Sequence, residues 1–453
     1  MYEPLYTAAE MRAAEERYPG YPASIPELME RAGTAVARET MLAFPGARRF
    51  ACVCGGGSNG GDGRVAARVL REAGHVADET AEGLDDYDVI VDALFGTGFH
   101  GEPRAEAADL IGRINATHVP VVSVDLPSGV DAATGEVAGA VVDADLTVTF
   151  HAWKLGLAVA PGCFHAGLVV VADIGLEQAA TEHRRATPAI LSHVPRRGPR
   201  DTKYTAGSVL VLGGEPGMTG AASLSALAAL RADAGYVTLA VPAESLPVVE
   251  GLVLEAVKIG WQEDDALETI TAGAQRASAI AIGPGLGRSD SRAALVRDLL
   301  RTMDLPAVVD ADALFGLEPS ERAAPTVLTP HAGELARLLA TDSAWVAAHR
   351  LEAVRTAADR FGAVVLLKGP DTIVAAPGAG AVVCDLGPPS LATAGTGDVL
   401  TGVAAAFLAK GLEPQLAAAA AAIAHAQAAH LVSQQAGLVA SDLLATLPAA
   451  LET

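Results

Sequence analysis

The chain has 453 residues, of which 51% are hydrophobic and only 4% aromatic, and its formal net charge at pH 7 is −22. A core made mainly of Ala, Val and Leu is typical of α/β layers, with Val-rich strands and Ala- and Leu-rich helices. The negative charge argues against nucleic acid and anionic membranes as partners. Anionic small molecules stay open, because backbone amides at helix starts bind phosphate even in an acidic protein.

The cysteine and terminal patterns indicate a reduced, cytoplasmic protein. The four cysteines are Cys52, Cys54, Cys163 and Cys384. They have neither a CxxC pair nor a Cys/His zinc spacing, so buried thiols are favoured over disulfides. The N-terminus lacks the apolar stretch of a signal peptide. The Ala-rich residues 416–432 contain interrupting polar side chains, which favours a packed helix over a membrane span. We expect a homo-oligomer.

In chain order, helices come first and apolar strands then alternate with further helices. A capping-box pattern at residues 7–10 opens one helix, and a second is expected over 26–42. The next expected elements are a helix at 62–73 and strands at 49–54, 89–93, 119–125 and 146–150. This alternation predicts a mostly parallel sheet covered on both faces.

The alternation pauses over residues 178–206, a basic, Pro-containing run that favours a linker, and then restarts. The second set comprises a helix at 220–234 and strands at 208–213, 237–241, 279–282, 307–310 and 364–368. The sequence therefore predicts two consecutive three-layer α/β domains, residues 1–195 and 196–453.

The first Gly-rich loop, residues 55–63, follows an expected strand and precedes an expected helix. Its Gly55-x-Gly57-x-x-Gly60 spacing satisfies the dinucleotide fingerprint, which alone is a weak signal. A plain tight turn is the alternative, but Asn59 and Asp62 add polar groups that such a turn does not need. Strand-to-helix context favours phosphate binding at the helix start.

Two further loops, residues 92–98 and 125–129, follow strands at matching points. In an open parallel sheet the carboxyl ends of strands border one ligand crevice, so all three loops are expected to meet. The oxygen donors of Asn59, Asp92 and Ser128 suit an alkali or alkaline-earth cation rather than zinc. Asp125 is a candidate for proton transfer.

Four ordered motifs, SNGGDG, DALFGTG, VDLPSG and FHAWKLG, make residues 1–180 resemble the NAD(P)H-hydrate epimerase family. The resemblance implies a Rossmann-like fold with a potassium ion held by Asn59, Asp92 and Ser128. It also implies hydrate contacts from Ser58, Asn59, Gly60, Gly61, Asp62, Gly96, Thr97, Gly98, Phe99, His100, Gly101, Glu102 and Asp125. Ser58 replaces the Asn that is usual in this family. Lys154 is either a surface lysine or a cofactor contact.

In the second domain, small residues precede Asp398 in the run 392–402, which leads into an apolar helix. Small residues allow backbone amides to approach a phosphoryl group, and the helix dipole adds positive potential. Asp398 is placed to accept a hydroxyl proton, the alternative being a simple helix cap. Other candidate loops are residues 283–287, 310–314, 328–334 and 368–372. No Walker-type lysine motif occurs.

The order GGEPGMTGAA, GPGLG, DADAL, TPHAGE, KGPDT and AGTGD resembles the ribokinase-like family, and within it the ADP-dependent NAD(P)H-hydrate dehydratases. By this resemblance the hydrate contacts are Ala222, Gly285 (or Gly287), His331 and Asp398. The implied nucleotide contacts are Lys368, Gly369, Pro370, Asp371, Thr372 and Gly397. Glu215 replaces the Ser that is usual in the first of these motifs.

Together the two resemblances imply a repair enzyme for hydrated NADH and NADPH (NADHX and NADPHX). Asp125 would serve the conversion of the R hydrate to S. Asp398 would serve phosphorylation of the S hydrate by ADP with magnesium, followed by loss of phosphate, which gives AMP and the reduced cofactor. The alternatives are a ribokinase-like kinase for a small alcohol, a nucleotide-sensing protein without activity, and an NAD-dependent dehydrogenase.

Overall fold

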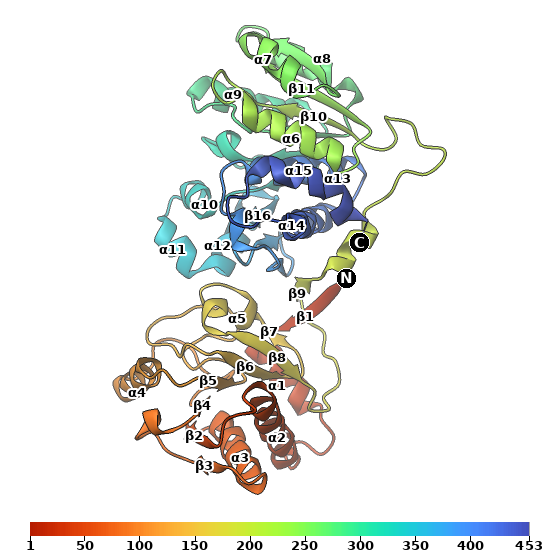
Figure 1. Cartoon of the computed structure of the whole chain (residues 1–453). Helices are drawn as coiled ribbons and strands as arrows, with labels where there is room; N and C mark the ends of the chain where they lie inside the picture. The colour runs from red at the N-terminus through yellow and green to blue at the C-terminus, as the bar shows by residue number, and fades with distance from the viewer. Residues whose placement is uncertain (453) are drawn as a thin grey trace. The chain divides into compact units, whose positions relative to one another are not determined.

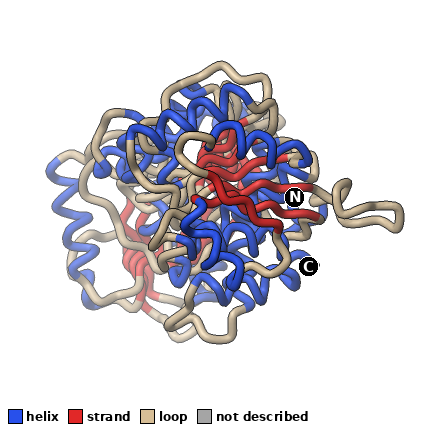
Figure 2. Tube along the Cα trace, turned by 90° about the horizontal axis from the view of Figure 1, so that it is seen from above, coloured by secondary structure: helices blue, strands red, loops and turns tan. Residues whose placement is uncertain are grey.

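The computed structural model describes residues 1–452, which form two compact units. The N-terminal unit comprises residues 3–184 with 347–349, and the C-terminal unit comprises residues 1–2, 185–346 and the chain from 350 onward. Figure 1 labels their elements, and in Figure 2 strands lie inside and helices outside. The prediction of α/β architecture with mostly parallel sheets is confirmed.

The N-terminal unit has a six-stranded parallel sheet in the order β3-β2-β4-β5-β6-β8. Its strands are β2 (Arg49–Cys54), β3 (Val76–Asp78), β4 (Val89–Ala93), β5 (Val121–Val124), β6 (Leu146–Phe150) and β8 (Leu168–Ala172). The short strands β1 (Tyr2–Tyr6) and β7 (Trp153–Lys154) pair in parallel with each other and are not part of this sheet. The helices are α1 (Ala8–Glu16), α2 (Ile25–Ala43), α3 (Ser58–Glu72), α4 (Ala105–Ala116) and α5 (Leu155–Ala158).

Strand β2 shows why this sheet is covered on both faces. Phe50 and Cys52 join the core cluster that includes α2 and α3, whereas Ala51 and Val53 join the cluster that includes α4. Successive residues of a strand point to opposite faces, so a continuous apolar run needs helices on both sides.

Two expectations need correction. The helix expected to begin at residue 62 begins at Ser58. Residues 58–61 are already helical, and the glycines among them permit the close backbone packing found there. Residues 178–206 are not simply a linker, since they contain β9 (His183–Ala186) and a 3₁₀ helix, Pro188–His193. Ile190, Leu191 and Val194 are buried in the core of the C-terminal unit, which fixes this segment.

The C-terminal unit has a sheet whose first seven strands, in the order β12-β11-β10-β13-β14-β15-β16, are parallel. They are followed by the antiparallel β17 and β18. The strands are β10 (Ser208–Leu212), β11 (Tyr236–Pro242), β12 (Val257–Trp261), β13 (Ala279–Ile282), β14 (Ala307–Val309), β15 (Thr326–Leu328), β16 (Val364–Leu367), β17 (Ile373–Ala375) and β18 (Val382–Val383).

The helices of this unit are α6 (Thr219–Arg231), α7 (Leu246–Leu252), α8 (Ala266–Gly273), α9 (Asp290–Thr302), α10 (Ala332–Leu339), α11 (Ser343–Ala348), α12 (Arg350–Phe361), α13 (Thr396–Ala409), α14 (Pro414–Leu431) and α15 (Ala440–Leu451). Helices α6, α13, α14 and α15 pack together over one face of the sheet (Figure 1). A Cβ at Gly402 would lie 2.1 Å from the Ser225 carbonyl oxygen, so glycine is needed where α13 meets α6. Among residues 1–452, no helix combines the length and apolar character that crossing a membrane requires.

Candidate active sites

The loops after β2, β4 and β5 meet at one edge of the N-terminal sheet, where they border a cavity of about 470 Å³. Eight predicted contacts line it: Ser58, Asn59, Asp62, Gly96, Thr97, Gly98, Phe99 and Asp125. Gly60, Gly61, His100, Gly101 and Glu102 lie outside this lining. Helix α1 contributes Arg12 and Glu15, which sequence reasoning missed because one turn of an exposed helix carries no site signal.

The Gly-rich loop is shaped by close backbone approach. A Cβ at Gly60 would lie 1.9 Å from the Gly55 carbonyl oxygen, which no side chain permits. Helix α3 therefore starts directly against the end of β2, and its first residues, Ser58 and Asn59, line the cavity. A helix start of this kind favours anions.

The three predicted cation ligands gather around the backbone of Phe95. Asn59 Nδ2 donates to the Phe95 carbonyl at 2.8 Å, and the Phe95 N–H donates to Ser128 Oγ at 2.9 Å. Asp92 is fully buried, and its carboxylate accepts from the Ser128 hydroxyl at 2.6 Å and from the Ser123 hydroxyl at 2.9 Å. Burial raises the pKa of Asp92, and these hydrogen bonds oppose the rise. The atoms predicted to bind a cation are the side-chain oxygens of Asn59, Asp92 and Ser128, and oxygen ligands suit a hard cation.

Asp125 has a left-handed backbone (φ 68°), a conformation that is uncommon outside glycine and often found at functional sites. Its Oδ1 accepts from Lys154 Nζ at 2.7 Å and from the Thr149 hydroxyl at 3.0 Å. Lys154 is completely buried, and its ammonium also donates to Thr149 Oγ1 and to the Phe150 carbonyl. The surface-lysine interpretation of Lys154 is therefore wrong, and its direct partner is Asp125.

Further carboxyl groups share this cavity with Asp125. Burial raises the pKa of Asp62 to about 8, with Asp125 and Glu15 adding to the rise and Lys154 opposing it. Burial also raises the pKa of Glu15. Asp62 is therefore largely protonated at neutral pH, and its carboxyl group offers a hydrogen-bond donor to a bound hydroxyl.

In the C-terminal unit, α13 begins at Thr396 with Gly395 as its N-cap, in a left-handed conformation (φ 88°). Asp398 lies inside the first turn, so it is not the N-cap residue. Burial raises the pKa of Asp398 to about 7; Asp310 also raises it and Lys368 lowers it. A carboxylate that titrates near neutral pH is suited to general-base catalysis.

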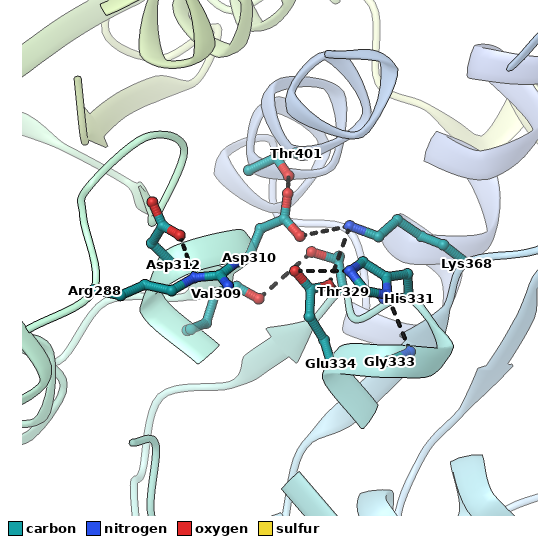
Figure 3. A network of polar contacts seen from close by, with 10 residues as sticks. All are labelled: Arg288, Val309, Asp310, Asp312, Thr329, His331, Gly333, Glu334, Lys368 and Thr401. Carbon is teal, nitrogen blue, oxygen red and sulfur yellow. Dashed lines mark hydrogen bonds and ion pairs between the residues drawn. The ribbon is translucent and has the colours of Figure 1, made fainter. Parts of the chain in front are cut away.

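The polar network drawn in Figure 3 includes Asp310, Lys368 and Glu334, which act electrostatically on Asp398. Lys368 Nζ pairs with Asp310 Oδ1 at 2.8 Å and lies 3.9 Å from Glu334 Oε2. The Thr401 hydroxyl donates to Asp310 Oδ2 at 2.6 Å. The network joins the ends of β14 and β16 to α10 and α13 and places an ammonium group at the amino end of α13.

His331 lies at the start of α10 as a capping residue. Its Nδ1 accepts from the Gly333 N–H at 3.0 Å, while Glu334 bonds back to the His331 N–H. The side chain remains 54% exposed, so capping leaves an imidazole face open to a ligand. Ala222, by contrast, is fully buried on α6, and Gly285 has a left-handed backbone beside Met218.

An arginine that sequence reasoning missed, Arg350, forms an ion pair with the predicted nucleotide loop, residues 368–372. Arg350 Nε donates to Asp371 Oδ2 at 2.8 Å and its Nη2 pairs with Oδ1 at 2.6 Å. Both side chains are buried. Asp371 is thus occupied by Arg350, so the predicted nucleotide contacts of this loop would come from its backbone and from Lys368 and Thr372.

Glu215, the departure in the first motif of the second domain, has a cationic partner. Its Oε1 lies 2.6 Å from Arg292 Nη2, and Arg292 also pairs with Glu263 at 2.9 Å. The guanidinium lies over the Trp261 ring, 4.7 Å from its centroid. The negative charge of Glu215 is therefore balanced locally.

The C-terminal unit has a ribokinase-like α/β fold with a polar network beside Asp398, and the N-terminal unit is Rossmann-like with its own polar cavity. Residues 209–449 match the family profile described as NAD(P)H-hydrate dehydratase, and residues 26–81 and 75–156 match the YjeF-related protein N-terminus. A ribokinase-like protein from Enterococcus faecalis, 22% identical, covers 61% of this chain and 98% of its own with a TM-score of 0.53, which shows the fold alone.

Several curated relatives span both units. The bifunctional NAD(P)H-hydrate repair enzyme of Moorella thermoacetica is 39% identical over 98% of this chain and 96% of its own. That of Escherichia coli is 34% identical over 93% and 88%, respectively. An ADP/ATP-dependent NAD(P)H-hydrate dehydratase from Bacillus subtilis, co-crystallised with ATP/Mg²⁺, is 30% identical, has a TM-score of 0.55 and covers 59% of this chain and 96% of its own. The chain belongs to the family of bifunctional NAD(P)H-hydrate repair enzymes, which combine an epimerase with a dehydratase.

Proposed function

We propose that the C-terminal unit dehydrates the S hydrate of NADH and NADPH with ADP, and that the N-terminal unit converts the R hydrate to S. The observation that carries the proposal is Asp398, half-buried in the first turn of α13 beside Lys368, with its pKa raised to about 7. As predicted from the sequence, we assign residues 1–195 to the epimerase and 196–453 to the dehydratase; of these, residues 185–195 pack with the C-terminal unit.

In the dehydratase, Asp398 accepts the proton of the 6-hydroxyl group as its oxygen attacks the terminal phosphoryl group of ADP. The amides at the start of α13, including that of Gly397, and the Lys368 ammonium stabilise the developing charge. Phosphate then leaves with a ring proton, which gives the reduced cofactor, AMP and phosphate. A magnesium ion bound with the nucleotide phosphates would supply further positive charge there.

Substrate contacts in this unit follow the loops described above. The nucleotide lies along residues 368–372 and Gly397, where its phosphates meet backbone amides and the Lys368 ammonium. The hydrate lies near Ala222, Gly285, His331 and Asp398. His331 supports this placement because its ring stays half exposed at the same network.

In the epimerase, Asp125 is the proton-transfer residue, held by Lys154 and Thr149. Asn59, Asp92 and Ser128, which gather at the loop after β4, would hold a potassium ion, and its positive charge would stabilise this loop. The hydrate lies in the cavity of about 470 Å³, with Ser58, Asp62 and residues 96–99 in contact. Potassium is expected to support epimerisation better than lithium, and equal rates in potassium-free buffer would remove the ion from this scheme.

The test is turnover of purified S and R hydrates with ADP and with ATP, measured as release of AMP, ADP and phosphate. Wild type is expected to release AMP and phosphate with the S hydrate and ADP. Asp398→Asn keeps the side-chain shape and removes the proton acceptor, so turnover is expected to fall about 10²–10⁴-fold while ADP still binds. Near-normal turnover by this variant would contradict the proposal. Phosphorylation of a small alcohol without hydrate turnover would indicate a kinase.

A further inference from the structure

The residues 310–314 form a motif, DADAL, whose first aspartate has no role in the mechanism above. Asp310 follows β14 and is only 1% exposed. One carboxylate oxygen pairs with Lys368 Nζ at 2.8 Å, and the other accepts from the Thr401 hydroxyl at 2.6 Å (Figure 3). Both oxygens are therefore occupied, which leaves this buried carboxylate no free position for a ligand.

The two partners of Asp310, Lys368 and Thr401, lie beside or on α13, the helix that carries Asp398. Lys368 Nζ would lie 3.4 Å from a Cβ built on Gly397, so the ammonium is beside the first turn of α13. Thr401 is on the same helix, three residues beyond Asp398, and residues at this spacing share a helix face. Asp310 thus connects the ammonium to the helix that carries the general base.

We propose that Asp310 is a positioning residue of the dehydratase, which fixes the Lys368 ammonium against α13 beside Asp398, with Thr401 holding its carboxylate in place. This inference rests on the proposed roles of Asp398 and Lys368. Correct placement matters because a shift of about 1 Å in a catalytic group costs on the order of 10²-fold in rate.

The charge of Asp310 has a second effect. The groups that face Asp398 are Asp310 and Asp312 after β14, Glu334 on α10 and Lys368 after β16. The buried His425 on α14 interacts electrostatically with Lys368. Burial is the largest cause of the raised pKa of Asp398, and Asp310 comes next. Removing the negative charge of Asp310 therefore lowers the pKa of the general base.

Asp310→Asn in the full chain tests the role, because asparagine keeps the shape and one acceptor oxygen but removes the charge and replaces the other acceptor with an NH2 donor. Per folded molecule, kcat for S-hydrate turnover is expected to fall about 10²-fold, with KM for ADP within about threefold of wild type. The acid limb of the kcat–pH profile is expected to move to lower pH. Unchanged kcat and an unmoved limb would overturn the proposal.

Thr401→Val is the matched variant, since it removes the hydrogen bond and leaves the Asp310 charge. It is expected to lower kcat by a smaller factor, roughly tenfold, without moving the acid limb. If Asp310→Asn does not fold, an unchanged kcat for Thr401→Val overturns the proposal by itself. Asp398→Asn separates the two claims: if that variant is active, the proposed function fails, whereas an inactive Asp398→Asn beside a normal Asp310→Asn refutes only the role of Asp310.

Discussion

A Lys154→Met substitution tests how the Asp125 carboxylate is held. Methionine approximates the length and volume of the lysine stem, but it removes the ammonium that lies 2.7 Å from Asp125 Oδ1. Asp125 is 7% exposed, so its carboxylate would remain buried with Thr149 as the remaining side-chain partner. Breaking a buried ion pair in this way costs about 3–5 kcal/mol. That is a large part of the about 5–15 kcal/mol that stabilises a typical domain.

Two measurements follow this loss separately. Hydrogen exchange of the β5 and β6 amides is expected to accelerate, since Asp125 directly follows β5 and Thr149 lies near the end of β6. Conversion of the R hydrate is expected to slow by on the order of 10²-fold, because the proton-transfer group loses its fixed position. Dehydration of the S hydrate by the same molecule serves as the internal control and is expected to stay normal. R-hydrate conversion within about threefold of wild type, with unchanged exchange, would refute this account of Asp125.

Three further substitutions probe charged groups elsewhere. Asp62→Asn is expected to stabilise the N-terminal unit by a few kcal/mol at about pH 9 and by less at about pH 6, measured by thermal unfolding. The pKa of Asp62 is about 8 in the folded protein and 3.8 ordinarily, so ionisation of Asp62 progressively destabilises the wild-type fold as the pH rises between these values. Arg350→Met leaves Asp371 buried without its partner, so KM for ADP is expected to rise at least tenfold, whereas Arg355→Met on the same helix leaves it unchanged. Arg12→Ala removes the one arginine among the residues that line the N-terminal cavity and is expected to raise KM for the R hydrate several-fold, with the exposed Arg17→Ala as control; equal KM values for the two would exclude Arg12 from substrate binding.

Local patterns in the sequence predict much of the fold. The strands at residues 49–54, 89–93, 146–150 and 279–282 have the predicted bounds, because continuous apolar runs flanked by glycine and polar residues form buried parallel strands. The start of α3 could not be predicted correctly from local propensity, because Gly60 and Gly61 disfavour a helix and tertiary packing overrides that preference. The same parallel geometry explains why three loops, far apart in the chain, meet at the N-terminal cavity.

The partners of the site residues could not be predicted from spacing. Asp310 meets Lys368 and Thr401 across separations of 58 and 91 residues, and no local pattern links them. Arg350 appears as one of several arginines in an amphipathic helix, and only the folded chain buries it against Asp371. Lys154 next to an apolar run fits a surface or a buried position equally well. Long-range ion pairs of this kind depend on the three-dimensional packing of loops.

The most direct test follows both hydrate epimers over time by chromatography, after a mixture of R and S hydrates is given to the full chain with ADP. Wild type is expected to consume nearly all of the mixture in one enzymatic phase, because R is converted to S as S is removed. Asp125→Ala is expected to give two phases: S vanishes at a near-normal rate, since Asp398 belongs to the other unit and sites that share no partners usually behave independently, and R decays only as fast as it epimerises unaided. Asp398→Asn is expected to equilibrate the epimers without restoring the reduced cofactor. A single phase at the wild-type rate for Asp125→Ala, or recovery of reduced cofactor by Asp398→Asn, would contradict the division of the repair reaction between the two units.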